Sequence, residues 1–437
     1  MTQKQTPTRS TPRTPERPCK PPLGLYVHWP FCKAKCPYCD FNSHVSTHID
    51  ADAFLAAFHT EMAYMANQLD HRTPLSSIFF GGGTPSLMPA FVVEAVIDKA
   101  ADIFGFMPDI EITAEANPTS VEASTMLDFH HAGVNRVSMG VQSLRDETLA
   151  FLGREHSAID AKTALATVRS AFDNISIDLI YATPDQTPKD WHDELSAALA
   201  LGLDHLSLYQ LTIESGTHFY TRQRRGETMA LDDDHAATLF DITRDLTQNA
   251  GLPAYEISNH AKPGHQCRHN LIYWQSGNWL GIGPGAHSRF TRQDSAHKNS
   301  RIGISTRRSP AGWLDAIAKD GHATDTFVTD GQNDWAAEML MMGLRLTSGL
   351  SLSQISAACG DYHNWLDIKG LRKCLDAGWL VATPQFDTPQ FDTPQFDTPK
   401  FEAPKFDTHD TEITHLHIRT SESGAIRLNH ILAELIL

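Results

Sequence analysis

The sequence of 437 residues contains no uninterrupted apolar run of the roughly 18–20 residues that a membrane-spanning helix needs. Its first stretch, MTQKQTPTRSTPRTPERPCKPP, has basic residues but lacks the apolar core of a secretory signal. An excess of positive charge is also absent, because 36 basic and 52 acidic residues leave a formal net charge of −16. These absences predict a cytoplasmic protein without a membrane span and argue against nucleic acid as a partner.

Cysteine is scarce as well. The seven cysteines are Cys19, Cys32, Cys36, Cys39, Cys267, Cys359 and Cys374. An odd, unevenly spaced set in a long chain does not form a disulfide framework. Three of them stand within eight residues, in C-K-A-K-C-P-Y-C, and this crowding indicates metal ligands.

Short β-rich runs alternate with helical stretches from Leu23 onward. The six runs cover residues 23–30, 77–85, 109–118, 136–143, 174–184 and 205–214. Between them lie amphipathic segments such as AFLAAFHTEMAYMANQL, whose apolar residues have helical spacing. Six strands that alternate with helices predict right-handed βαβ units and a parallel sheet. A closed barrel would need eight such units, so we expect an α/β fold with an open, partial (β/α)6 barrel.

The composition along the chain predicts four parts. Residues 1–22 are rich in Thr, Pro and Arg and predict a disordered tail. The barrel is expected over 23–225, followed by a loop-rich connecting region, dense in His, Trp and Gly, over 226–330. Residues 331–437 suggest a small winged-helix-like α+β domain. Within it, a five-residue repeat, T/A-P-Q/K-F-D/E, covers 383–407, and its regular prolines predict an extended, exposed insertion.

The three crowded cysteines, Cys32, Cys36 and Cys39, directly follow the first predicted strand. Structural zinc sites usually take four ligands from two separated pairs, and the sequence has no second pair nearby. Thiolates at this close spacing are common ligands of a [4Fe–4S] cluster. Three thiolates leave one iron open, and a small molecule can coordinate an open iron.

Other unusual residues fall at the ends of successive predicted strands. Gly81–Pro85 ends the second strand, and its glycines allow the backbone to approach a ligand closely. Glu115 and Gln142 end the third and fourth strands, Asp178 lies on the fifth, and Arg154 follows in L-G-R-E-H. In parallel α/β barrels the carboxyl ends of the strands carry the active site. We therefore predict one rim that holds a cluster and a ligand bearing an amine and a carboxylate.

Taken together, the motifs HWPFC-x3-C-x2-C, GGGTP, EANP, GVQS, LGR and DLIYATP resemble the radical S-adenosylmethionine superfamily, and more narrowly its anaerobic coproporphyrinogen oxidase branch. The resemblance covers about residues 23–290, with a weaker echo in EMLMMGLRLTSGL. It implies a [4Fe–4S] cluster on Cys32, Cys36 and Cys39, an electron donor for that cluster, and S-adenosylmethionine on the open iron.

The same resemblance implies the residues that hold S-adenosylmethionine. The positions that match the family's ligand pattern are Tyr26, Gly82, Gly83, Thr84, Glu115, Gln142, Arg154 and Asp178. In this family pattern Glu115 accepts a hydrogen bond from the methionine amino group. Arg154 and Asp178 contact the carboxylate and the ribose.

Two functions compete within this branch. The oxidases carry a further cysteine two residues after the triad, where this chain has Phe41. Phe41 and the stretch HNLIYW at 269–274 resemble instead the HemW-type haem chaperones. This resemblance implies a carrier, rather than an enzyme, that binds haem through His269 and hands it to acceptor haemoproteins, including membrane-bound ones by peripheral contact. The alternative is an oxygen-independent coproporphyrinogen-III oxidase, a radical decarboxylase.

The residues themselves leave the haem ligand open. Imidazole is a common axial ligand of haem iron, and aromatic neighbours such as Tyr273 and Trp274 can stack on a porphyrin. The other candidates are His260, His265, His287 and the thiol of Cys267. From residue 330 onward acidic residues outnumber basic ones, so we expect the last domain to act as a lid or a protein-docking surface rather than to bind DNA.

Overall fold

The computed structural model describes residues 22–46, 48–293, 299–384 and 413–437. Two sequence predictions lie almost entirely outside the described residues. Of the predicted tail at 1–22, only residue 22 is described, and of the repeat at 383–407, only residues 383 and 384.

Six parallel strands, adjacent in chain order, form the body of the main sheet. They are β1 (Leu23–Trp29), β4 (Leu75–Gly82), β5 (Phe106–Ala116), β6 (Arg136–Gln142), β7 (Asn174–Tyr181) and β8 (His205–Gln210). Each overlaps a strand predicted from the sequence. The sheet stays open, because β8 pairs with the short antiparallel strand β9 (Asn259–Ala261) instead of returning to β1. The predicted partial (β/α)6 barrel is therefore confirmed.

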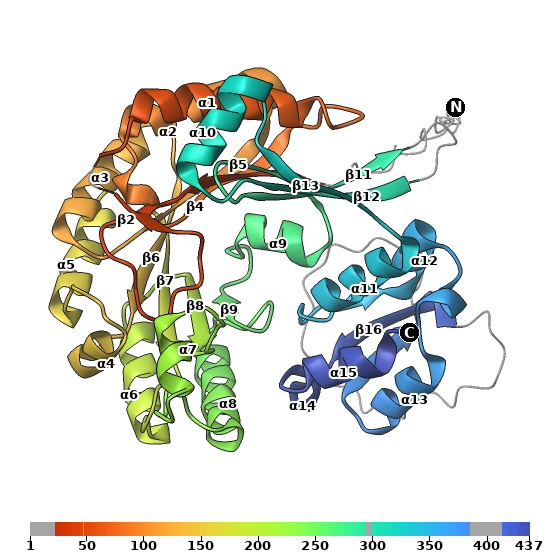
Figure 1. Cartoon of the computed structure of the whole chain (residues 1–437). Helices are drawn as coiled ribbons and strands as arrows, with labels where there is room; N and C mark the ends of the chain where they lie inside the picture. The colour runs from red at the N-terminus through yellow and green to blue at the C-terminus, as the bar shows by residue number, and fades with distance from the viewer. Residues whose placement is uncertain (1–21, 47, 294–298, 385–412) are drawn as a thin grey trace, which may run out of the picture.

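Helices follow these strands, and the longer ones pack along the outer face of the sheet (Figure 1). They are α1 (Ala51–Ala66), α2 (Ala90–Phe104), α3 (Ser120–His131), α4 (Asp146–Phe151), α5 (Ala158–Val168), α6 (Pro188–Leu199), α7 (His218–Gln223) and α8 (Asp233–Asn249), with a 3-10 turn, η1 (Pro85–Leu87), after β4. Local sequence sets several helix starts. Ser157 and Thr187, for example, form capping boxes with Asp160 and Asp190.

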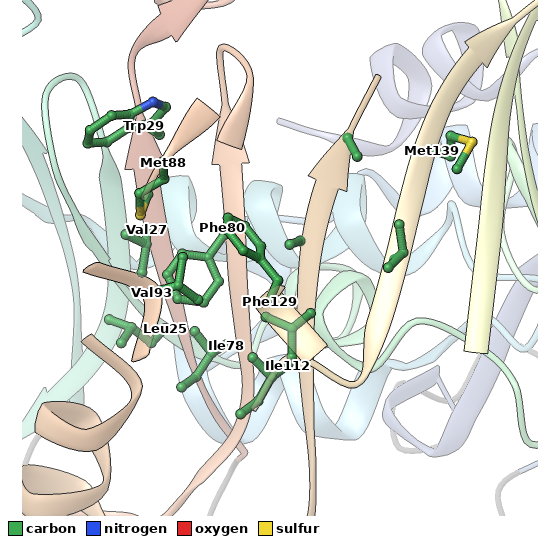
Figure 2. Close-up of a cluster of buried hydrophobic side chains, with 14 of the residues drawn as sticks. Leu25, Val27, Trp29, Ile78, Phe80, Met88, Val93, Ile112, Phe129 and Met139 are labelled. Carbon is green, nitrogen blue, oxygen red and sulfur yellow. The ribbon is translucent and has the colours of Figure 1, made fainter. Parts of the chain in front are cut away.

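The alternation of side chains along β1 separates the core from the site. Leu25, Val27 and Trp29 are fully buried, and Figure 2 shows them in the cluster of buried apolar side chains that β1 shares with its neighbours. Successive side chains of a strand point to opposite faces. Tyr26 and His28 therefore point toward the interior of the barrel, where the predicted site lies.

The region 226–330 contains much regular structure, so the expectation of a loop-rich stretch was wrong. Four strands continue the main sheet beyond β1, and two helices accompany them. They are β10 (Asn278–Ile282), β11 (His287–Gln293), β12 (Asn299–Thr306), β13 (Thr324–Asp330), α9 (Arg268–Trp274) and α10 (Pro310–Asp320). The glycines reflect tight strand packing, because a Cβ on Gly281 would lie 2.3 Å from the His287 carbonyl oxygen. The predicted domain boundaries at 225 and 330 stay predictions.

The last part of the chain forms an α+β unit with its own apolar core. Its elements are α11 (Gln332–Gly343), β14 (Leu350–Ser351), α12 (Leu352–Cys359), η2 (Tyr362–Asn364), α13 (Ile368–Asp376), β15 (Leu380–Pro384), η3 (Ile413–His415), β16 (Leu416–Thr420), α14 (Glu422–Ala425) and α15 (Leu428–Leu435). The strands form an antiparallel sheet in the order β14-β16-β15. Such helices beside a small antiparallel sheet agree with the predicted winged-helix-like α+β architecture.

Buried ion pairs join this unit to the barrel. Arg301 is fully buried and donates to Glu338 of α11 from Nε at 3.2 Å and from Nη2 at 3.1 Å. Arg345 pairs with the fully buried Glu256 at 3.1 Å. Figure 1 shows α9 between the barrel strands and this unit. None of the helices in the described ranges has the length and hydropathy needed to cross a bilayer.

Candidate functional site

The cysteine loop follows β1 and is held at both ends. The short strands β2 (Phe31–Cys32) and β3 (His44–Val45) pair in parallel and close the loop at its base. At its far end, the Pro37 carbonyl oxygen accepts from the Phe219 N–H of α7 at 2.9 Å. Tyr38 packs near Phe219, with ring centroids 6.2 Å apart. The loop is therefore closed at its base by its own two ends and held at its far end by α7.

The three predicted cluster cysteines are half-buried and free of disulfides. The Thr84 hydroxyl donates to the Cys32 sulfur at 3.4 Å, and Arg154 Nη1 donates to the Cys36 sulfur at 3.4 Å. Burial raises the pKa of the Cys32 and Cys39 thiols. In the described part of the chain no three His, Cys, Asp or Glu side chains are grouped closely enough to hold a metal ion, so the thiols border the site without meeting at one point.

The donors nonetheless have the chemistry that an iron–sulfur cluster requires. Three thiols lie on one short loop, and cationic and hydroxyl donors point at two of the sulfur atoms. The Nε of Arg154 is also buried and has no hydrogen-bond partner among the described residues. Metal ligation deprotonates thiols, and hydrogen bonds to sulfur stabilise the resulting thiolates. These residues fit a [4Fe–4S] cluster.

The glycine-rich end of β4 lies directly against the cysteine loop. The Gly83 N–H donates to the Trp29 carbonyl oxygen at 2.8 Å, and the Thr84 N–H donates to that of Phe31 at 2.8 Å. A Cβ on Gly83 would lie 2.6 Å from the Phe31 carbonyl oxygen and 3.0 Å from the Cys32 sulfur. Gly82 has a φ of +118°, a conformation that favours glycine. This close approach explains why the motif needs glycine.

Arg154 connects the cysteine loop to the ends of β5 and β6. Its Nη2 donates to Asn117 Oδ1 at 2.6 Å and to the Gly140 carbonyl oxygen at 3.0 Å. Gln142, the last residue of β6, has a φ of 68°. That left-handed backbone is uncommon for a residue other than glycine and is often found at functional sites. Arg154 and Gln142 both lie against Gly140 at one edge of the site, where Arg154 contacts Cys36.

A cavity of about 200 Å³ opens inside the barrel below this rim. It is lined by Tyr26, Phe79, Glu115, Arg136, Ser138, Asp178, Ser207, Tyr209, His269, Asn270 and Tyr273. Burial, helped by the charge of Asp178, raises the pKa of Glu115 to about 8. Burial also raises the pKa of Asp178, whose carboxylate accepts from the Ser138 hydroxyl at 3.1 Å. Two acidic groups in a small enclosed space can receive a cationic ligand group.

His269, the predicted haem ligand, lies in the wall of this same cavity. Its Nδ1 forms a hydrogen bond with Ser77 Oγ at 2.8 Å, and its Nε2 with the Tyr273 hydroxyl at 2.7 Å. The residue is only 1% exposed. Burial, helped by the charge of Arg136, lowers its pKa to about 3, so the ring is neutral. Both ring nitrogens are already engaged.

Helix α9, which carries His269, is held by an acidic residue that the sequence did not single out. The Glu111 carboxylate of β5 accepts from the backbone N–H of Arg268 at 3.1 Å and of His269 at 3.2 Å. The Cys267 thiol donates to it at 3.4 Å. Glu111 thereby satisfies the free N–H groups at the start of the helix.

The structure brings most of the predicted residues together, but in two groups. Tyr26, Glu115, Asp178 and His269 line the cavity. The second group contacts the cysteine loop or its neighbours at the rim, and it consists of Gly82, Gly83, Thr84, Gln142 and Arg154. The sequence did not identify five other cavity residues, which are Phe79, Arg136, Ser138, Ser207 and Tyr209. Ser138 of β6 and Ser207 of β8 could have been noticed as polar residues within mostly apolar stretches of their strands.

The chain is similar to known proteins over most of its length. The Radical SAM superfamily model matches residues 26–198. The chain is 40% identical over 329 residues to the mouse radical S-adenosyl methionine domain-containing protein 1, mitochondrial, which covers 75% of this chain and 74% of that protein. It is 36% identical over 345 residues to the heme chaperone HemW of Mycobacterium tuberculosis, and this match covers 77% of this chain and 85% of that protein. It is 39% identical over 318 residues to the heme chaperone HemW of Escherichia coli, and this match covers 70% of this chain and 80% of that protein.

A solved structure of coproporphyrinogen III oxidase (HemN) from Escherichia coli shares the fold. Its TM-score is 0.73, and the superposition covers 95% of this chain and 90% of that one. Sequence identity is only 20%, so this likeness concerns the fold alone. The extent and identity of the sequence matches carry further: this chain belongs to the radical SAM superfamily and, within it, to the family of the HemW and radical S-adenosyl methionine domain-containing 1 proteins.

Proposed function

We propose that this protein is a haem chaperone, which binds haem and transfers it to acceptor haemoproteins. The observation that carries the proposal is the 36% and 39% identity to proteins named heme chaperone HemW, over most of both chains. The resident groups of the barrel are a [4Fe–4S] cluster and S-adenosylmethionine. Haem is the cargo.

The cluster is held by Cys32, Cys36 and Cys39. Their position on one loop, between donors from Thr84 and Arg154, supports this assignment. When bound, the cluster supplies an open iron and an electron. The protein contributes a fixed loop, charge beside the sulfur atoms and partial exclusion of water.

S-adenosylmethionine occupies the rim and the cavity beneath it. Its ligands are Tyr26, Gly82, Gly83, Thr84, Glu115, Gln142, Arg154 and Asp178. Glu115 supports this assignment. Burial raises the pKa of its carboxyl, and the ammonium group of a ligand beside it would favour the ionised form. Arg154 also supports the assignment, because within the described part of the chain its Nε has no hydrogen-bond partner and can donate to a carboxylate.

The alternative function, oxidative decarboxylation of coproporphyrinogen III, lacks comparable support. The fold likeness to HemN does not carry an activity at 20% identity. Phe41, which stands where the oxidases have a further cysteine, is 58% exposed, and its side chain cannot ligate a metal.

One experiment separates the two functions. The reconstituted protein is incubated anaerobically with coproporphyrinogen III, S-adenosylmethionine and a strong reductant, and the products are weighed by mass spectrometry. In parallel, haem is titrated into the same preparation and the Soret band is followed. Intact coproporphyrinogen together with saturable haem binding supports the chaperone. Loss of carboxylates, with a working oxidase as control, would make the protein a decarboxylase.

Three further assignments belong to the proposal. The acceptor is a haemoprotein, the cluster receives its electron from a separate donor, and peripheral contact with membrane-bound acceptors is part of the proposed transfer. The cytoplasmic location stays a prediction from the sequence. The names of the mouse and bovine relatives include the word mitochondrial.

A further inference from the structure

The geometry around His269 raises the question of where haem is held. The His269 ring is 1% exposed and uses both nitrogens, toward Ser77 and Tyr273. The adjoining cavity of about 200 Å³ is smaller than the roughly 300–1,000 Å³ typical of pockets for drug-sized ligands. It is also shared with residues assigned to S-adenosylmethionine. Haem cannot reach this imidazole while the barrel has the described conformation.

A different surface beside the cysteine loop exposes large apolar side chains. Phe41 is 58% exposed and Val45 is 60% exposed, and they are four positions apart on the segment that returns from the cysteines. Val45 lies opposite Cys32 in the β2–β3 pairing. Single exposed apolar residues are ordinary. Two on one short segment add exposed apolar area at the edge of the proposed cofactor site.

Asn42 connects this segment to two others that carry a histidine and arginines. Its Nδ2 donates to the Pro284 carbonyl oxygen at 2.8 Å and to the Arg308 carbonyl oxygen at 2.9 Å. Gly285 is pressed against the same side chain, since a Cβ there would lie 2.5 Å from Asn42 Nδ2. These contacts place the turn before His287 and the Arg307–Arg308 pair next to Phe41.

Backbone contacts bring these groups together. The Gly285 N–H donates to the Arg307 carbonyl oxygen at 3.0 Å, and His287 pairs with Ser305 across β11 and β12. His28 lies close by, since its Nε2 forms a hydrogen bond with the Asn42 carbonyl oxygen at 2.9 Å. Its pKa falls to about 4, chiefly through burial, and charges on His287, His44 and Arg308 lower it further. The Arg308 charge also lowers the pKa of His287, after burial. His287, Arg307 and Arg308 therefore belong to one region of the rim, beside Asn42.

The side chains of this surface are available for a ligand. His287, Arg307 and Arg308 are all exposed. Over the ranges that the structure describes, neither arginine forms an ion pair and the His287 ring has no hydrogen-bond partner. In a chain of net charge −16, two adjacent unpaired arginines beside an apolar patch suit a ligand that is flat, apolar and anionic at one edge.

We propose that haem is held at this surface, with the His287 imidazole on its iron, Phe41 and Val45 against the macrocycle, and Arg307 and Arg308 on its propionates. Imidazole is a common axial ligand of haem iron, and arginine pairs well with carboxylates. The site rests on the proposed haem-chaperone function and names the residues that serve it. It lies beside the cysteine loop, so a bound haem would border the cluster.

The test is a titration of haem, followed by the Soret band, into the full, reconstituted chain and into three single variants. They are His287→Ala, His269→Ala and, as the control, His192→Ala, which changes an exposed histidine on α6. Changes even to outer partners of a metal typically cost about 10- to 100-fold in affinity, so loss of the direct ligand in H287A should weaken haem binding at least about tenfold. H192A should bind as wild type. Unchanged affinity of H287A would overturn the proposed site.

A second variant tests the arginines without touching the iron. Arg307→Ala combined with Arg308→Ala should weaken haem binding but leave binding of the haem dimethyl ester, which has no carboxylates, unchanged. Equal effects on both ligands, or none on either, would refute propionate recognition here. If the wild-type chain takes up no haem at all, the proposed function fails. If it binds haem and both sets of variants bind equally well, only the site fails.

Discussion

Arg154 lies 118 positions from Cys36 in the chain, and its Nη1 donates a hydrogen bond to the Cys36 sulfur at 3.4 Å. The other end of the same guanidinium holds Asn117 and the Gly140 carbonyl oxygen. One half-buried cation thus joins the cysteine loop to the ends of β5 and β6. It aligns the proposed cluster with the proposed site of S-adenosylmethionine.

The first prediction concerns the cluster cysteines. Changing Cys36 to Ala should abolish the brown iron–sulfur absorption after anaerobic reconstitution, because the two remaining thiolates cannot hold the cluster. Cys359→Ala is the matched control, since Cys359 is buried in α12, away from the loop. Full iron loading of C36A would show that the ligands were misassigned.

The second prediction concerns Arg154. Arg154→Gln keeps much of the side-chain length but removes the charge, so S-adenosylmethionine affinity should fall by roughly 10- to 100-fold, as for other partners near a metal site. Equilibrium dialysis measures this, and the iron content should change much less. Arg145→Gln serves as control, because Arg145 pairs with Asp190 at the surface. Equal affinities of the R154Q and R145Q variants would exclude the proposed contact.

The third prediction is a pH dependence that comes from Glu115. Its pKa of about 8 in the ligand-free protein means that the carboxyl is mostly protonated at neutral pH. An ammonium group favours the ionised form, so binding of S-adenosylmethionine below pH 8 must release this proton. Affinity should therefore rise with pH, by at most about tenfold per unit, and level off above pH 8.

Glu115 also affects stability, and the sign follows from the same shift. Because the folded pKa is raised from 4.5 to about 8, the folded state binds more protons than the unfolded one between these values. The free energy of unfolding of the ligand-free chain should fall as the pH rises through this window. Glu115→Gln should flatten both pH profiles, and profiles identical to wild type would assign them to another group.

The fourth prediction concerns the anchor of α9. Glu111→Ala leaves the N–H groups of Arg268 and His269 without their acceptor, so the free energy of unfolding should fall by about 1–3 kcal/mol. Urea denaturation measures it, and Glu147→Ala, an exposed acid in α4, is the control. A loss no larger than that of E147A would mean that α9 does not depend on Glu111.

The sequence predicted the parallel half of the fold well, because each strand there is a short β-rich run between helical periodicities. It missed β10–β13, where glycines such as Gly281 and Gly303 serve close strand pairing and resemble loop composition. Motif positions at strand ends predicted the rim residues.

The surroundings of His269 could not be predicted from the sequence. Its partner Ser77 is 192 positions away, and only the folded barrel brings the two together. The same holds for Glu111, which lies 158 positions from His269. A motif can identify a histidine as a candidate ligand. Whether the ring nitrogens of that histidine are free or already hydrogen-bonded depends on such distant contacts.

Haem transfer can be measured with the purified chain and an acceptor. The reconstituted chain is loaded with haem, freed of excess haem by gel filtration and mixed with an apo-haemoprotein whose Soret band differs from its own. We predict that the Soret band moves to that of the acceptor, and that an excess of haem-free H287A chain does not compete. A Soret band that stays with this chain, whichever apo-haemoprotein is offered, would contradict the account.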